Sequence, residues 1–250
     1  MTNELDRRSF VQAGSALTAG AAVTAAMWPP EAAAQTPPPT APGATAQPAA
    51  TPKPKMFELK PMPFDPKKIK GISEKLLVSH YENNYGGAVK RLNAILEQLA
   101  NLDYAKAPGF QINGLKREEL VATNSMILHE LYFSGLGSDE SHPGEALGEA
   151  LTRDFGSIDR WRAEFVAMGK AEGGGSGWVL LNWDPRNKRL VNAWAADHTT
   201  TLAAGQPILE LDMYEHAYQM DYGAKAGDYV EAFMRAIHWT NADMLFAQYS

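Results

Sequence analysis

Two residues that could bind one metal ion lie four positions apart in the C-terminal part of the chain. Asp212 and His216 occur within residues 209–222, LELDMYEHAYQMDY. In a helix, side chains at this spacing lie on one face, so the carboxylate and the imidazole could approach a single point. Such pairs also occur by chance on solvated polar faces. Here most neighbours are apolar or aromatic, and a carboxylate in apolar surroundings needs a paired charge or a metal. We therefore interpret the pair as two ligands of one metal ion.

The absence of cysteine limits the ligands that a metal site could use. The 250 residues include six histidines and no cysteine, which excludes disulfides, thiolate sites and cysteine nucleophiles. His80 and His129 lie among apolar residues at helical spacing, so both are expected to be buried. A single buried histidine more often makes a hydrogen bond in the core than binds a metal. Together with Asp212 and His216, they make three imidazoles and one carboxylate, which suits iron or manganese and could also bind zinc.

Helices and strands are expected to be separate along the folded part of the chain. Two apolar runs, 178–183 and 189–195, flank the turn Asp184-Pro-Arg-Asn187 and predict a β-hairpin. Apolar periodicity and end signals predict an extended arm over 57–66 and helices over 73–99, from about 117 to 133, over 144–154 and 158–169, around Asp212 and over 226–245. This order predicts an α+β fold. An N-terminal helical hairpin domain, 57–140, is followed by a mixed domain of helices and a small antiparallel sheet, 141–250.

The first 56 residues are expected to lie outside the folded domain. Arg7 and Arg8 precede a weakly apolar run that ends in three alanines, so residues 1–34 resemble a twin-arginine export signal. An uncleaved membrane anchor is the alternative. Residues 35–56 are rich in proline and alanine, which is typical of a linker. A signal of this type predicts a periplasmic or secreted protein that is exported already folded.

The charge of the chain limits its partners. The formal net charge is −6, and a mildly acidic protein is a poor partner for nucleic acid or for an anionic membrane. We expect neither as a partner once the signal has been removed.

The candidate ligands lie in segments that resemble the iron/manganese superoxide dismutase family. Residues 212–218, DMYEHAY, resemble the family signature D-x-W-E-H-A-Y. His129, in HELYF, lies where the family has its second ligand in H-x-x-F/Y-W. The resemblance runs from Phe57 to the C-terminus. It includes His80-Tyr81 with Leu92-Asn93, Gly135-Leu-Gly and Gly175-Ser-Gly-Trp178.

This resemblance implies a metal site and a reaction. It implies that His80, His129, Asp212 and His216 bind one iron or manganese ion per subunit. The implied activity converts superoxide to oxygen and hydrogen peroxide, for which one metal must accept and return an electron in turn. Three neutral imidazoles and one carboxylate leave such an ion with a net positive charge, which attracts an anionic substrate.

Several positions depart from the family pattern. Tyr214 replaces the signature tryptophan, and Ala88 replaces a tyrosine usual at the mouth of the site. Asn84 replaces a frequent histidine, and Gln219 replaces a tyrosine. These departures leave open a non-catalytic metal-binding protein on a dismutase scaffold. The ligand set alone would also fit a zinc hydrolase.

A glutamine of the family is missing from both of its usual places. In the family this glutamine bonds the coordinated solvent, and the two places are Ser125 and His198 here. We expect His198 to replace it, because an imidazole can donate or accept a hydrogen bond and Ser125 is small. A loop histidine that faces solvent is the alternative. Trp178 and Tyr214 are expected to wall the site, although core packing alone would also explain Trp178.

The resemblance also implies a homodimer. Glu215 of one subunit is expected to bond His216 of the other, because a ligating histidine generally needs an acceptor for its second nitrogen. The alternative for Glu215 is an ordinary surface glutamate.

Overall fold

The computed structural model describes residues 53–138, 141–172 and 175–250. These residues belong to one compact unit that spans Ala49–Ser250. The predicted export signal, residues 1–34, and the linker up to residue 52 lie outside the described residues. Within the described ranges, no helix combines the length and apolar character needed to cross a membrane.

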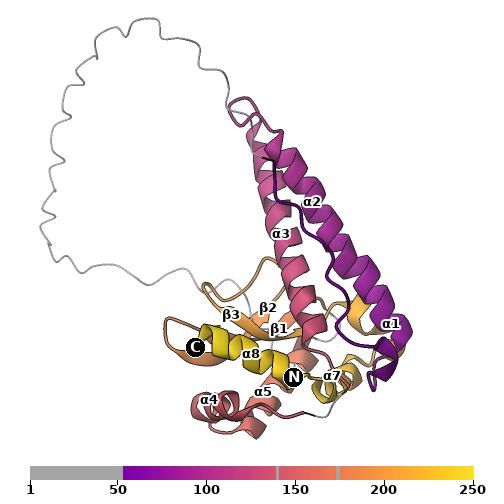
Figure 1. Cartoon of the computed structure of the whole chain (residues 1–250), viewed down its shortest axis with the longest axis vertical. Coiled ribbons are helices and arrows are strands. Elements are labelled where there is room, and N and C mark those ends of the chain that lie inside the picture. Colours follow the sequence, from indigo (N-terminus) through magenta and orange to yellow (C-terminus); the bar gives the residue numbers. More distant parts are fainter. Residues whose placement is uncertain (1–52, 139–140, 173–174) are drawn as a thin grey trace, which may run out of the picture. The chain divides into compact units, whose positions relative to one another are not determined.

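The N-terminal part of this unit is a helical hairpin with an extended arm beside it. Its elements are a 3-10 turn (Pro66–Lys68), α1 (Glu74–Ser79), a π-helical turn (His80–Tyr85), α2 (Gly86–Ala100) and α3 (Gly109–Ser134). Ser73 Oγ accepts a hydrogen bond from the Leu76 amide and so caps the N-terminus of α1. Phe57 and Asn93 exchange two hydrogen bonds of 2.9 Å that hold the arm against α2. Figure 1 shows α2 and α3 side by side, with the arm following them.

Helix α3 begins earlier than its apolar pattern indicates. The predicted start near Arg117 is wrong, because the helix begins at Gly109, directly after Pro108. Residues 109–119 are mostly exposed, so the first turns bury no apolar face that a periodic pattern could reveal. Gly109 and Gly114 also lower the helix propensity of this segment. Apolar periodicity therefore marks only the part of α3 that packs against its neighbours.

The predicted β-hairpin is confirmed and gains a third strand. Strands β1 (Trp178–Asp184) and β2 (Arg189–Ala195) pair antiparallel, and β3 (Gln206–Asp212) pairs antiparallel with the other edge of β1. The sheet order is β2-β1-β3. Trp178 lies directly opposite Asp212 in this register. The sheet thus places these two side chains on one face.

The predicted helix around Asp212 is wrong, because Asp212 is the last residue of β3. Residues 208–211 are buried on both faces of the sheet. A short apolar run of this kind does not distinguish a strand from a buried helix. The chain then continues through a 3-10 turn (Glu215–Ala217) and the short α6 (Gln219–Tyr222).

The predicted last helix, 226–245, is in fact two helices. These are α7 (Ala226–Arg235) and α8 (Trp239–Tyr249). Between them, Ile237 forms an antiparallel bridge with Leu136. The His238 amide donates a 2.7 Å hydrogen bond to the Gly135 carbonyl. This pairing with a distant segment satisfies backbone groups that a continuous helix would have used.

Helices pack against the sheet to complete the fold. The two that precede the sheet in sequence are α4 (Glu145–Phe155) and α5 (Ile158–Glu172), close to their predicted bounds. Helix α5 contacts β1, α8 contacts β3, and the C-terminal part of α3 also packs on β3. The predicted α+β class is confirmed. The division into two domains near residue 140 stays a prediction.

Candidate metal centre

Four side chains from separate elements meet where the hairpin contacts the sheet. His80 begins the π-helical turn, His129 lies in α3, Asp212 ends β3, and His216 lies in the 3-10 turn that follows. Their ligating atoms all lie within 4.8 Å of one another. The structure therefore brings together the four residues whose types suggested a metal site.

Asp212 lies in the middle of this group. Its Oδ2 is 3.1 Å from Nε2 of both His80 and His216 and 3.5 Å from Nε2 of His129. Its Oδ1 accepts a 2.8 Å hydrogen bond from the Tyr214 amide, which orients the carboxylate. Asp212 and His216 thus converge through the end of a strand and a 3-10 turn, and not through the helix face that their spacing suggested.

The ring nitrogens show which atoms are available to a metal. His129 Nδ1 lies 2.6 Å from the Ser125 carbonyl oxygen, so Nδ1 carries the proton and Nε2 keeps its lone pair for the centre. His80 is buried, and neither of its ring nitrogens makes a hydrogen bond among the described residues, although Nε2 lies 3.1 Å from Asp212 Oδ2. A buried polar group without a partner is costly. A metal bound at this imidazole would offset that cost.

The charges at the centre suit metal binding. Burial raises the pKa of Asp212, but the facing His216 and His80 outweigh it and hold the pKa below its usual range. Burial lowers the pKa of His80, and it lowers the pKa of His129 to about 3. A charged carboxylate and neutral imidazoles are the forms that bind metals. These nitrogen and oxygen donors fit a first-row ion such as iron or manganese.

A pocket of about 340 Å³ reaches the centre from outside. One wall comes from the π-helical turn and α2, the opposite wall from α3, and the inner end from three histidines. The lining residues are Asn83, Asn84, Gly87, Ala88, Arg91, Val121, Ala122, Ser125, His129, His198 and His216. A small molecule could therefore approach His129 and His216 through this pocket.

His198 lies at the inner end of the pocket. Its Nδ1 accepts a 3.0 Å hydrogen bond from Trp178 Nε1, and its carbonyl accepts one of 2.6 Å from the Asn124 side chain. Its ring is 5.8 Å from that of His129, between ring centroids. Burial lowers the pKa of His198, which favours the neutral ring. Because Nδ1 accepts, the neutral ring carries its proton on Nε2.

Tyr214 and Trp178 enclose the centre on the sheet side. The Tyr214 ring stacks on His198 and on His216, with centroids 4.8 and 5.3 Å apart. Trp178 is fully buried, and its ring meets His129 edge-on at 5.2 Å. Both side chains therefore contact candidate ligands or His198.

The other departures from the family pattern lie in different places. Ala88 and Asn84 line the pocket, whereas Gln219 is exposed and does not.

The hydroxyl groups of Tyr81 and Tyr85 bond to the backbone of Lys60 in the arm. Those phenols are therefore engaged away from the centre.

Two residues near the centre were not predicted from the sequence. Arg91 lines the pocket, and the helical spacing of Asn84, Ala88 and Arg91 could have indicated it. Glu172 is buried at the end of α5, and its two carboxylate oxygens have no hydrogen-bond partner among the described residues. Burial and the nearby Asp212 raise the pKa of Glu172 to about 8. No local sequence pattern marks a glutamate as buried.

Comparison with known proteins identifies relatives that are named superoxide dismutases. The family model described as iron/manganese superoxide dismutases, C-terminal domain, matches residues 143–244. An iron superoxide dismutase of Cupriavidus metallidurans is 66% identical over 192 residues, which cover 77% of this chain and 97% of the relative.

More distant relatives differ in the metal that they are named for. A manganese superoxide dismutase of Haloferax volcanii is 36% identical over 190 residues, covering 73% of this chain and 92% of the relative. A manganese/iron superoxide dismutase of Propionibacterium freudenreichii is 30% identical over 198 residues, covering 77% and 98%.

Proposed function

This chain belongs to the iron/manganese superoxide dismutase family and converts superoxide to oxygen and hydrogen peroxide, and from this premise we propose which side chains perform the reaction. His80, His129, Asp212 and His216 are the ligands of one iron or manganese ion per subunit. The convergence of their ligating atoms within 4.8 Å carries this proposal. When bound, the metal supplies the electron transfer by alternating between two oxidation states.

The protein provides a neutral hydrogen-bond donor beside the metal position. His198 lines the inner end of the pocket, and Trp178 occupies its Nδ1. Nε2–H is therefore the donor that the ring can offer to solvent or substrate in the pocket. The group that bonds solvent at a metal controls how readily that solvent holds a proton, and so tunes the metal's potential. His198 performs this task in place of the family's glutamine.

Trp178 and Tyr214 support His198. Trp178 fixes the tautomer through its hydrogen bond, and Tyr214 holds the ring plane by stacking at an interplanar angle of 15°. Ser125 is engaged with His129, with Oγ 3.3 Å from Nδ1. Two aromatic neighbours thus preorganise one donor and keep water from its inner side.

Substitution of His198 tests this role. We expect His198→Gln to keep its metal and to shift the reduction potential, and His198→Ala to lose about 10-fold or more in activity with little loss of metal. His142→Gln is a matched control at an exposed histidine. Metal content, potential and superoxide consumption are measured on the same samples. Wild-type potential and turnover in His198→Ala would refute the role, and bound metal without activity in the native protein would favour a non-catalytic scaffold.

A homodimer is proposed through Glu215 and His216. Glu215 is exposed on the 3-10 turn, and the His216 side chain beside it keeps 26% of its surface accessible. A carboxylate from a second subunit could accept a hydrogen bond from the second nitrogen of His216. Glu215→Ala should then weaken the dimer and metal retention together, whereas Glu149→Ala, at an exposed glutamate, should change neither. Sedimentation velocity and metal analysis test this prediction. An unchanged dimer with its full metal content would reject the hydrogen bond between Glu215 and His216 of the two subunits.

Export is proposed from the first 56 residues. We assign 1–34 as a twin-arginine-type signal and 35–56 as a linker, which would place the enzyme in the periplasm or outside the cell. Replacing Arg7 and Arg8 by lysine should retain the protein in the cytoplasm. Cell fractionation with an activity stain measures this, and unchanged export would contradict the assignment.

A further inference from the structure

The pocket that leads to the centre has a single permanently charged side chain among its lining residues in the described part of the chain. This side chain is Arg91, and apart from the histidines every other lining residue is uncharged. Superoxide is an anion, whereas the whole chain has a formal net charge of −6. A local positive charge at the entrance would therefore counter a field that disfavours the substrate.

Two rows of side chains form the walls of the pocket. Asn84, Ala88 and Arg91 follow one another at helical spacing along the π-helical turn and α2. On α3, Ala122, Ser125 and His129 do the same, and Glu118 lies one turn before Ala122. The inner ends of these rows are at the metal ligands, so Arg91 and Glu118 lie at the outer ends.

Arg91 and Glu118 interact across the entrance. Arg91 Nη2 forms an ion pair with Glu118 Oε2, and the side chains keep 56% and 34% of their surface accessible. An exposed pair of this kind contributes little to stability. Its charges nevertheless act over the screening length of roughly 10 Å at moderate salt. Arg91 lines the same pocket as His129, His198 and His216. The charge of Arg91 therefore lies on the route to the inner end of the pocket.

We propose that Arg91 attracts superoxide into the pocket and that Glu118, by pairing with it, sets how much of this positive charge the substrate meets. The proposal rests on the pocket being the route to the proposed metal ligands. Arg91 acts on the approach of the substrate and leaves the electron transfer itself unchanged. Its removal should therefore lower the rate at limiting superoxide and spare the metal.

Two single substitutions that should change the reaction rate in opposite directions test this proposal. At an ionic strength of about 10 mM, Arg91→Gln should lower the second-order rate about 2- to 5-fold, and Glu118→Gln should raise it by a similar or smaller factor. Arg91→Lys should keep most of the rate. At about 200 mM the differences should shrink, because the charges are screened. Pulse radiolysis or stopped-flow decay of superoxide measures these rates, with metal content determined for each variant.

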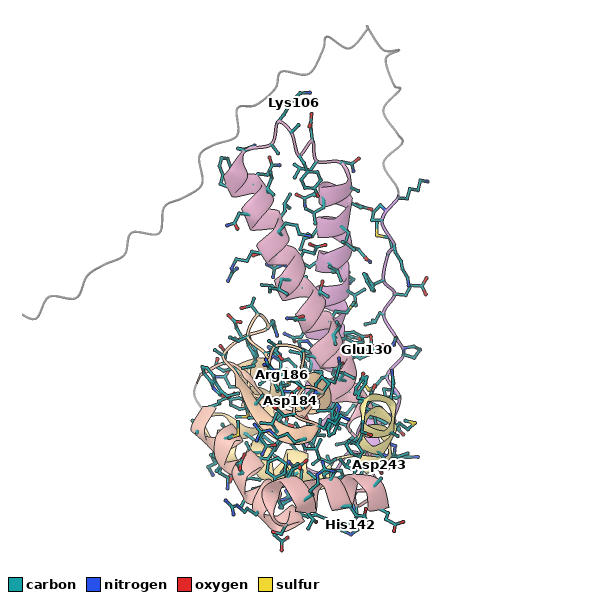
Figure 2. The ribbon with its side chains drawn as sticks, turned by 90° about the vertical axis from the view of Figure 1, so that its left-hand side faces the viewer. Lys106, Glu130, His142, Asp184, Arg186 and Asp243 are labelled. Atoms are coloured by element: carbon teal, nitrogen blue, oxygen red, sulfur yellow. The ribbon has the colours of Figure 1, made fainter. Side chains whose placement is uncertain are left out.

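A matched control and a second measurement distinguish electrostatic attraction of the substrate by Arg91 from a structural effect of the substitution. Lys106 lies at the tip of the hairpin (Figure 2), so Lys106→Gln changes the net charge equally, away from the pocket. Azide is an inert anionic probe, and its dissociation constant on the metal-loaded enzyme should rise in Arg91→Gln and stay unchanged in Lys106→Gln. Equal rate losses in Arg91→Gln and Lys106→Gln, or losses in both Arg91→Gln and Glu118→Gln, would overturn the proposal. An inactive, metal-free native protein would instead refute the proposed function.

Discussion

Two buried acids on the same face of β3 differ in their charge. Asp212 and Glu210 are two residues apart, so their side chains point to the same side of the strand. Their residues are 0% and 1% exposed. Asp212 faces three imidazoles, and its pKa lies below the usual range. The oxygens of Glu210 have no hydrogen-bond partner among the described residues, and burial raises its pKa well above the usual range. Equal burial thus leaves one acid charged and keeps the other neutral, and the partners decide which.

The largest expected effect comes from removing the charged acid. Asp212→Ala should weaken metal binding more than about 100-fold, since even loss of an outer partner of a ligand costs about 10- to 100-fold. Activity should be lost with the metal. Glu210→Ala is the matched control and should keep about one metal ion per chain, even though it leaves a small cavity. Metal analysis after dialysis against a chelator measures both. Equal metal loss in the two variants would abolish the contrast between the acids.

A third buried acid extends the comparison to pH. Burial and the charge of the nearby Asp212 raise the pKa of Glu172 in the folded protein to about 8, above the value of about 4.3 for an unfolded glutamate. At pH values between these two pKa values, Glu172 keeps its proton in the folded protein and has lost it in the unfolded protein. The free energy of unfolding therefore falls as pH rises, by at most about 1.4 kcal/mol per pH unit. Glu172→Gln should flatten this fall.

Denaturant unfolding of the metal-loaded protein at several values between about pH 5 and about pH 8 measures the effect of Glu172. Glu149→Gln, at an exposed glutamate, should keep the native slope. The same slope in Glu172→Gln as in the native protein would show that this acid is charged in the folded state.

The smallest effect is expected from replacing the neutral acid by an apolar side chain. Glu210→Met removes a buried polar group without a partner at similar length, and should raise the free energy of unfolding by about 1 kcal/mol. Glu210→Gln should stay close to the native value. Chemical unfolding of the metal-loaded proteins measures both. A loss of stability in Glu210→Met would indicate that Glu210 has a partner in solution.

The four residues that the structure brings together as candidate metal ligands could be picked out from the sequence because their neighbours are informative. His216 stands in DMYEHAY, and His80 and His129 stand among apolar residues at helical spacing. The hairpin around Asp184 was equally clear, since a turn sequence separates two apolar runs. These features are local, so a single sequence reveals them.

Other features depend on contacts between distant segments and were missed. The run before Asp212 has the composition of a buried strand or of a buried helix, and only pairing with β1 decides between them. The break at Ile237 exists because Leu136 pairs with it. Glu210 and Glu172 are buried although glutamate is usually exposed. Propensity and periodicity carry none of this information.

The distance in sequence between the proposed ligands has a consequence for folding kinetics. His129 and His216 are 87 residues apart, and one belongs to the hairpin while the other follows the sheet. Closing such a long loop is slow and comes after local structure has formed. A complete set of ligands therefore exists only once the hairpin has docked on the sheet. Interactions that form after the folding transition state slow unfolding and leave the folding rate unchanged. We therefore expect a metal that binds only the complete set to prolong the lifetime of the folded chain more than it speeds the formation of that chain.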